Sequence, residues 1–350
     1  MVIKMDSFHN LFESTIVGIS VCLFIIAMSW FGIFTYRRIA VKKNILANPN
    51  FRSLHENPIP KGGGIVFSFI FVVCIIVLWF QGKLSENLFW VLGVGGFIAA
   101  LFGFIDDLIN IRASRKLLVQ VFLSVWVLFW FDGGPLSNIA LIPNFIAVPL
   151  SIFFMVWMIN AYNFMDGVDG MAVAGAVFVS GSLALVMLLT HGSLEVTTLF
   201  LLLIMSIGAF IVFNWPPASI FMGDAGSVFL GYVFGSLILF TVMNVEIIIW
   251  TWLTVFGYFF ADTTVTQIAR VILVKKWYGA HRSHAYQNLA RITDSHLKIT
   301  LGVTFYHLVW ILPLTFWTVI QPELAMFAAF LAITPGMILT YKYGPILSSS

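Results

Sequence analysis

Apolar residues form long runs along this chain, and the polar residues lie mostly in the segments between those runs. A helix needs about 20 apolar residues to cross the roughly 30 Å hydrocarbon layer of a bilayer. Eleven runs approach that length, at about residues 15–36, 64–80, 87–105, 117–131, 142–162, 171–190, 196–213, 225–243, 246–265, 299–320 and 324–341. The pattern predicts an all-α polytopic membrane protein, with residues 1–350 forming a single integral membrane domain.

The composition agrees with this class. Of the 350 residues, 60% are hydrophobic and 9% are charged, and the mean hydropathy is +1.00, which leaves too little polar surface for a soluble globule. Cys22 and Cys74 both fall within apolar runs and have no neighbours of metal-ligand type. The sequence therefore predicts neither a disulfide framework nor a zinc site.

The basic residues predict the orientation, because Lys and Arg favour cytoplasmic loops. Only Lys4 and Lys83 lie apart from the rest, and 16 of the 18 Lys and Arg residues fall in a few segments of one predicted side: residues 37–61, 112–116 and 270–298, and Lys342. With an odd number of helices, the N-terminus is predicted outside and the C-terminus in the cytoplasm. The net charge of +3 then reflects contact with anionic membrane lipids, and nucleic acid is not an expected partner.

One polar group interrupts the apolar pattern in the segment NAYNFMDGVDG, residues 160–170. Asn163, Asp166 and Asp169 follow one another at intervals of three, so on a helix they would share neighbouring parts of one face. A charge inside a bilayer costs about 3 kcal/mol on insertion scales and needs a counter-charge, water or a metal. Capping of the next helix by these acids remains an alternative.

Two adjacent carboxylates, Asp106 and Asp107, end the third apolar run, and Lys116 begins the fourth. Neighbouring carboxylates repel one another, so one tends to keep its proton unless the two share a cation. This arrangement is typical of a metal ligand or a general base. The structural alternative is ion pairing with Arg112 and Arg115.

A third acidic position is Asp224, in the segment NWPPASIFMGDAGSVFLG at residues 214–231. Two prolines end one helix, and small residues surround Asp224 at a predicted helix start, where backbone N–H groups favour anions. A carboxylate with nearby glycines suits a diphosphate bridged by magnesium. Asp262, inside the ninth run, is predicted to point inward with Arg270 or a neighbouring helix as its partner.

Two basic loops are candidate phosphate sites, since Arg and His together favour phosphate over zinc, which needs further soft ligands. For the first loop, contact with anionic headgroups is the alternative. The candidate residues of the two loops are Arg52, His55, Lys61, His281, Arg282 and His284.

All these clusters fall on the predicted cytoplasmic side, although they are scattered along the chain. Asp oxygens suit Mg²⁺, which takes one or two carboxylates together with substrate phosphates, and the cations would neutralise a diphosphate. The residues thus indicate a membrane enzyme that joins a water-soluble phosphate donor to a lipid acceptor. The competing class is an ion-coupled transporter, whose acids usually lie near the bilayer midplane on broken helices.

Four motifs carry a resemblance to a known family: DD at Asp106, NxxDGxDG at residues 163–170, FMGDxGS at 221–227 and HRSHAYQ at 281–287. In this order they resemble the polyprenyl-phosphate N-acetylhexosamine-1-phosphate transferases of glycosyltransferase family 4. The resemblance implies an eleven-helix fold in the bacterial inner membrane with a cytoplasmic active site. It also implies Mg²⁺-dependent transfer, or Mn²⁺-dependent transfer, of a sugar-1-phosphate from a UDP-N-acetyl sugar to undecaprenyl phosphate, with release of UMP.

The resemblance also implies residue roles. Asp106, Asp107 and Lys116 would be catalytic, Asp224 and Asp166 would hold the metal, and Asn163, Asp166, Asp169 and Asn214 would belong to the nucleotide and metal shell. HRSHAYQ is closer to the branch that initiates O-antigen or related cell-envelope polysaccharides than to the phospho-MurNAc-pentapeptide transferases of peptidoglycan synthesis, which remain the alternative. The N-acetyl sugar and a homodimeric state remain open.

Overall fold

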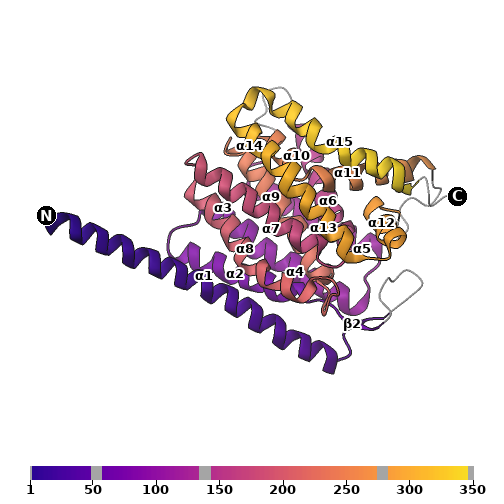
Figure 1. Cartoon of the computed structure of the whole chain (residues 1–350), viewed down its shortest axis with the longest axis horizontal. Coiled ribbons are helices and arrows are strands. Elements are labelled where there is room, and N and C mark those ends of the chain that lie inside the picture. The colour runs from indigo at the N-terminus through magenta and orange to yellow at the C-terminus, as the bar shows by residue number, and fades with distance from the viewer. Residues whose placement is uncertain (1, 49–56, 134–142, 274–282, 346–350) are drawn as a thin grey trace.

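The structure is a computed structural model that describes residues 2–48, 57–133, 143–273 and 283–345. It is almost wholly helical (Figure 1), which confirms the predicted all-α class. Its strands in the described residues are β1 (Leu46–Ala47) and β2 (Ile59–Pro60), which pair antiparallel. The helices are α1 (Val2–Lys42), α2 (Gly64–Phe80), α3 (Glu86–Leu88), π-helix η1 (Phe89–Gly95), α4 (Gly96–Ile109), α5 (Ala113–Trp130), α6 (Asn144–Phe164), α7 (Met171–Leu189), α8 (Leu194–Asn214), α9 (Gly223–Met243), α10 (Ile249–Val255), α11 (Gly257–Leu273), α12 (Ala285–Thr293), α13 (His296–Tyr306), π-helix η3 (His307–Ile311), α14 (Leu312–Ile320), 3₁₀-helix η4 (Pro322–Leu324) and α15 (Ala325–Tyr343).

Within the described residues, nine helical segments are long and apolar enough to cross a membrane, so the chain is a multi-pass membrane protein. Two predicted runs fall outside those nine. The run at 64–80 is α2, which is apolar but only 17 residues long. The run at 246–265 forms two helices, α10 and α11, which are separated at Phe256.

The third run is also not a plain α-helix, since it contains the π-helical turn η1. A π-helical turn disrupts the regular hydrogen-bond ladder. Here two carbonyls of the turn accept from neighbouring helices: Trp126 Nε1 donates to the carbonyl of Trp90 at 3.0 Å, and the Tyr232 hydroxyl donates to the carbonyl of Val91 at 3.0 Å. The turn is thereby fixed between α5 and α9.

Helix α9 is the centre of the bundle and is buried along nearly its whole length. It packs most extensively against α4 and α6. Glycines bring these backbones together: a Cβ on Gly103 would lie 2.1 Å from the carbonyl oxygen of Asp224, and one on Gly64 would lie 2.3 Å from the Cα of Gly226. Small residues permit such close helix approach in membranes, so the start of α2 and the second half of α4 lie beside the start of α9.

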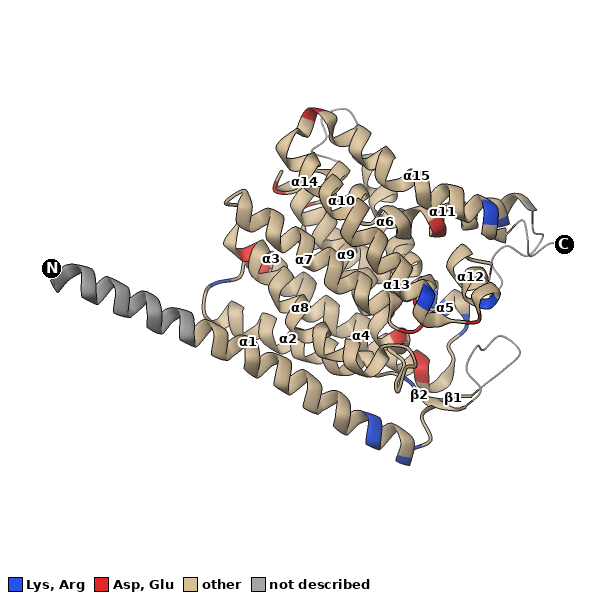
Figure 2. Cartoon of the chain, viewed as in Figure 1, with Lys and Arg blue, Asp and Glu red and all other residues tan. Residues whose placement is uncertain are grey.

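The charged residues show how the bundle is oriented. Figure 2 shows Lys and Arg at the ends of α1, α5, α12, α13 and α15 that face the same side of the molecule. This is the arrangement expected from the one-sided basic residues of the sequence. The placement of that side in the cytoplasm stays a prediction.

We predict that Gly103→Ala destabilises the protein, because the added methyl group would meet the backbone of α9 and overpacking costs about 1–3 kcal/mol. Thermal unfolding in detergent measures the effect as a lower Tm. The control is Gly208→Ala in α8, where a Cβ meets nothing within 4 Å and a gain in helix propensity is expected. Equal Tm values for the two variants would contradict the close α4–α9 packing.

Candidate active site

The first carboxylate of the site, Asp107, holds the start of α9. Its two oxygens accept the backbone N–H groups of Asp224 at 3.1 Å and Ala225 at 3.0 Å. The first N–H groups of a helix lack partners within the helix and favour negative charge. Gly223 has φ of 71°, and a Cβ there would lie 2.4 Å from an oxygen of Asp107. Glycine is therefore required where α9 meets α4.

The second carboxylate, Asp106, is 3% exposed and pairs with Lys116. Its other oxygen accepts the backbone N–H of Ile111 at 2.6 Å. The Lys116 ammonium also lies 2.9 Å from an oxygen of Asp224, so one cation joins the ends of α4, α5 and α9. Arg112 and Arg115, the alternative partners, are exposed. Within the described residues, the ion pair of Asp106 is formed with Lys116.

Asp224 is the point at which these segments converge. Its second oxygen accepts from Asn163 Nδ2 at 2.8 Å, and the same amide group donates to Ser227 Oγ at 2.8 Å. The carboxylate of Asp224 is thus bonded to α5 through Lys116 and to α6 through Asn163. Residues more than 100 positions apart in the chain meet around one side chain.

Asp166 lies in the turn between α6 and α7 and differs from the other acids. Its side chain is half-buried, and within the described residues it has no hydrogen bond or ion pair. Burial raises its pKa well above the usual range, and the nearby carboxylates of Asp224, Asp107 and Asp169 raise the pKa further. This carboxylate is therefore free to bind a cation or a substrate.

Asp169 and Asn214 hold loops together. The Asp169 carboxylate accepts the backbone N–H of Ala218 at 3.0 Å, and its other oxygen lies 3.0 Å from Nδ1 of His296. Asn214 is buried; its amide oxygen accepts the backbone N–H of Gly170 at 3.0 Å, and its amide nitrogen donates to a carbonyl of the α8–α9 loop. Both side chains, predicted from the resemblance to contact the substrate, have their polar atoms engaged in fixing the α6–α7 turn.

The buried Asp262 of α11 repeats the arrangement of Asp107. It is 0% exposed, which confirms that it points inward, and its partner is a neighbouring helix. Its oxygens accept the backbone N–H groups of Ala285 at 3.1 Å and Tyr286 at 3.3 Å, at the start of α12. His284, which precedes α12, lies with Nδ1 3.5 Å from the same carboxylate. The HRSHAYQ segment thus begins a helix that a buried acid holds in place.

Helix α12 in turn lies against the turn that carries Asp166. The Tyr286 hydroxyl donates to the carbonyl of Phe164 at 2.5 Å, and a Cβ on Gly167 would lie 2.4 Å from that hydroxyl. The rings of His284 and Phe164 are 5.7 Å apart. The described residues of the four motifs singled out in the sequence therefore come together at one end of the bundle.

The basic loops are only partly described. Lys61 follows β2, where its backbone carbonyl accepts from the Tyr36 hydroxyl at 2.9 Å, and its charge is a favourable neighbour of Asp107. Arg52, His55, His281 and Arg282 lie outside the described residues.

The donor set can be tested against the predicted Mg²⁺. In the parts of the chain that the structure describes, no group of three or more His, Cys, Asp and Glu residues is arranged to hold a metal by itself. Mg²⁺ does not need such a group, since it takes one or two carboxylates and fills its shell with water and substrate phosphates. The unpaired Asp166 carboxylate beside Asp224 fits that requirement.

Two contributors were not singled out from the sequence. Ser227 shares Asn163 with Asp224, and His296 contacts Asp169 from the start of α13. Ser227 is within the FMGDxGS motif, which is a signal that could have identified it. Nothing in the sequence around His296 indicates its distant partner.

Comparisons with known proteins agree with the geometry. Residues 89–242, which run from η1 to α9, match the model of Glycosyl transferase family 4. The chain is 29% identical to a probable undecaprenyl-phosphate N-acetylglucosaminyl 1-phosphate transferase of Bacillus subtilis (strain 168), over 76% of this chain and 75% of that protein. It is 34% identical to the phospho-N-acetylmuramoyl-pentapeptide-transferase of Fervidobacterium nodosum over 55% and 62% of the two chains, and 28% identical to that of Lactococcus lactis subsp. cremoris (strain MG1363) over 75% and 80%.

We predict that Asp166→Asn makes the protein more stable. Because the pKa of Asp166 is raised in the folded state, ionisation of this carboxyl opposes folding. Between the unfolded and the folded pKa, the folded protein binds more protons than the unfolded one, so stability falls as the pH rises toward the folded pKa. The amide removes this cost. The Tm of the variant should exceed that of the wild type by roughly 2–4 °C per kcal/mol relieved, and should vary less between pH 8 and pH 6. A lower Tm at every pH would show that Asp166 is structural.

We also predict that Asp262→Ala loosens α12, because it leaves buried N–H groups without an acceptor at a cost of about 1–3 kcal/mol. Hydrogen exchange of the α12 amides should become faster while exchange in α9 stays slow. The matched control is Asp294→Ala, an exposed acid at the end of the same helix. Equal exchange in the two variants would contradict the role of Asp262 as a cap.

Proposed function

We propose that this chain, whose residues 89–242 match the model of Glycosyl transferase family 4, acts as a transferase of that family. In this proposal it transfers an N-acetylhexosamine-1-phosphate from a UDP-sugar to undecaprenyl phosphate. The products are undecaprenyl-diphosphate-linked sugar and UMP. The lipid product would start a cell-envelope polysaccharide such as O-antigen. The site would face the cytoplasm from the bacterial inner membrane, where nucleotide sugars are available.

The observation that carries this proposal is the meeting of Asp106, Lys116, Asn163, Asp166 and Asp224 at one end of the bundle. A phosphoryl transfer needs positioning and charge neutralisation more than covalent chemistry. This site supplies one ammonium and an unpaired carboxylate within a single cluster, and the Asn163 amide orients the Asp224 carboxylate beside them. An end of a membrane bundle is also where a soluble donor and a lipid headgroup can meet.

In the proposed reaction, an oxygen of the lipid phosphate attacks the sugar-bearing β-phosphorus of the donor. The bond between that phosphorus and the bridging oxygen breaks, and UMP leaves with the electron pair. Lys116, 35% exposed, would bind the acceptor phosphate or the developing negative charge. Asp166 and Asp224 would hold Mg²⁺, which when bound neutralises charge on the donor diphosphate.

Asp107 has a different role in this proposal. Both of its oxygens are occupied by backbone N–H groups of α9, so it positions Asp224 and does not contact the substrate. Asp106 is held by Lys116 and would control the position of that ammonium. In this proposal neither Asp106 nor Asp107 acts as a nucleophile. The lipid phosphate attacks the donor directly, and no aspartyl-phosphate forms.

The alternative within the same chemistry is transfer of phospho-MurNAc-pentapeptide, as the names of two similar proteins indicate. The B. subtilis relative is named for N-acetylglucosaminyl-1-phosphate transfer. The segment HRSHAYQ at residues 281–287 favours a UDP-N-acetylhexosamine as the donor over UDP-MurNAc-pentapeptide. Purified protein given undecaprenyl phosphate and each UDP-sugar separately should release UMP with a UDP-N-acetylhexosamine and far less with UDP-MurNAc-pentapeptide.

We predict that Asp224→Asn lowers kcat by at least about 100-fold, because an amide is a poor Mg²⁺ ligand and cannot pair with Lys116. UMP release measures kcat, and thermal unfolding verifies that the variant folds. The matched control is Glu323→Gln, which neutralises an exposed acid in η4 and should leave kcat unchanged. Wild-type kcat in a folded Asp224→Asn protein would remove the metal assignment.

The wild type tests the competing class. If it released UMP from none of the UDP-sugars, a transporter would be favoured.

A further inference from the structure

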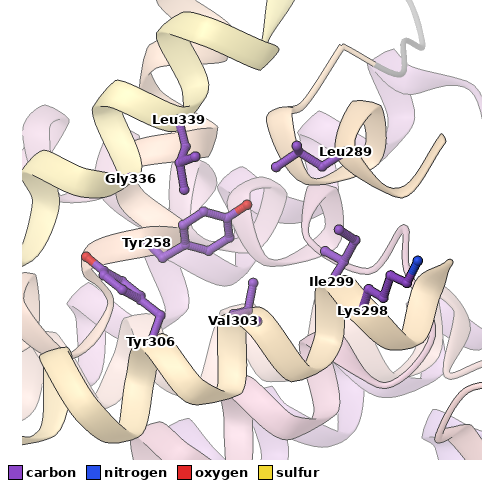
Figure 3. Close-up of a pocket in the computed structure, with 9 residues that line it drawn as sticks. Tyr258, Leu289, Lys298, Ile299, Val303, Tyr306, Gly336 and Leu339 are labelled. Atoms are coloured by element: carbon purple, nitrogen blue, oxygen red, sulfur yellow. The ribbon is translucent and has the colours of Figure 1, made fainter. Parts of the chain in front are cut away.

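A second candidate site lies outside the acidic cluster. A cavity of about 220 Å³ lies between α11, α12, α13 and α15. Figure 3 shows the side chains that line it. Apart from Lys298 and the hydroxyls of two tyrosines, its lining is apolar. The lining residues are Tyr258, Leu289, Lys298, Ile299, Gly302, Val303, Tyr306, Gly336 and Leu339.

The chemistry of the lining indicates what can fill this space. An apolar cavity of about 150 Å³ already holds a benzene molecule and stays free of water. Gly302 is exposed, and a Cβ on it would meet nothing within 4 Å, so the cavity is open beside α13. In a bilayer, the apolar material available at such an opening is a lipid chain. A hydrocarbon segment would restore the contacts that an empty cavity lacks.

The charges beside the cavity select the headgroup. Lys298 belongs to the lining and lies in the first turn of α13, a helix start that itself favours anions. Arg291 lies in the last turn of α12 and Lys342 in the last turn of α15. Figure 2 shows these basic helix ends on the same side of the bundle. These helix ends carry three basic residues, and the acid of the α12–α13 connection is Asp294. The excess of positive charge favours an anionic headgroup.

We propose that this cavity binds one anionic phospholipid, with a segment of an acyl chain between Tyr258, Gly302 and Leu339 and the phosphate at Lys298. The lipid would contact α12 through Leu289 and would help to hold this helix, whose start is capped by Asp262. The site shares no lining residue with the acidic cluster, and binding there does not depend on the transferase reaction.

The experiment uses the whole chain in vesicles of equal parts phosphatidylcholine and phosphatidylglycerol. After gentle extraction, native mass spectrometry counts the lipids that remain bound. The wild type should retain one phosphatidylglycerol. Gly302→Leu, whose side chain occupies the cavity, should lose that lipid, and Gly18→Leu should keep it, since Gly18 is an exposed α1 position with nothing within 4 Å of its Cβ.

A second pair of variants tests the headgroup without altering the packing. Lys298→Gln should lower phosphatidylglycerol retention about fivefold, the effect of one cation near an anionic lipid surface. Lys83→Gln, in the α2–α3 connection and outside the cavity lining, should leave retention unchanged. Added inorganic phosphate should not displace the lipid, because the acyl chain supplies part of the binding.

Three results would overturn the proposal. Retention by Gly302→Leu equal to the wild type would show that the lipid is bound elsewhere. Equal retention of phosphatidylcholine and phosphatidylglycerol by the wild type would remove the headgroup assignment. One-for-one displacement by undecaprenyl phosphate would assign the cavity to the acceptor's tail.

Discussion

The interaction on which the rest of the site depends is a buried carboxylate bonded to the first N–H groups of a helix. Asp107 binds the start of α9 in this way, and Asp262 binds the start of α12. Each bond satisfies backbone donors that have no partner within their own helix, at positions where both carboxylates are buried. The two caps fix α9, which carries Asp224, and α12, which carries Tyr286. An acid without such a partner would be costly here, and Asp166 shows that cost in its raised pKa.

The site therefore combines acids of two kinds. Asp107 and Asp262 hold helices, whereas Asp166 has its oxygens free, and Asp106 and Asp224 share the ammonium of Lys116. Several carboxylates against one cation are unfavourable in the empty protein and become favourable when a divalent ion or a cationic group is added. In the proposed reaction, this excess of negative charge would favour a donor diphosphate that carries a divalent ion, at the expense of the protein's own stability.

Much of the fold and part of the site could be predicted from the sequence. Apolar runs predict helices because a membrane span must satisfy its own hydrogen bonds, and the polar interruptions at Asp106, Asp166 and Asp224 indicate the functional end of the bundle. The separation of α10 from α11 at Phe256 was missed, because an apolar run shows no sign of a break. The hydrogen bonds that Asp107, Asp169 and Asn214 make to distant backbone groups could not be predicted for another reason. Whether a polar side chain binds a substrate or a backbone N–H group depends on which distant segment lies beside it, and neither spacing nor composition carries that information.

Helix α9 gives the acidic part of the site a fixed position. Because α9 is buried along nearly its whole length and glycines bring α2 and α4 into backbone contact with it, its first turn has no room to move relative to Asp107. Helix α12 is shorter and lies at the edge of the bundle, and its position rests on the Asp262 cap, the Tyr286 hydroxyl and its packing on α15. Motion needed to admit a donor or release a product would therefore occur at α12, while the acids at the start of α9 remain in place.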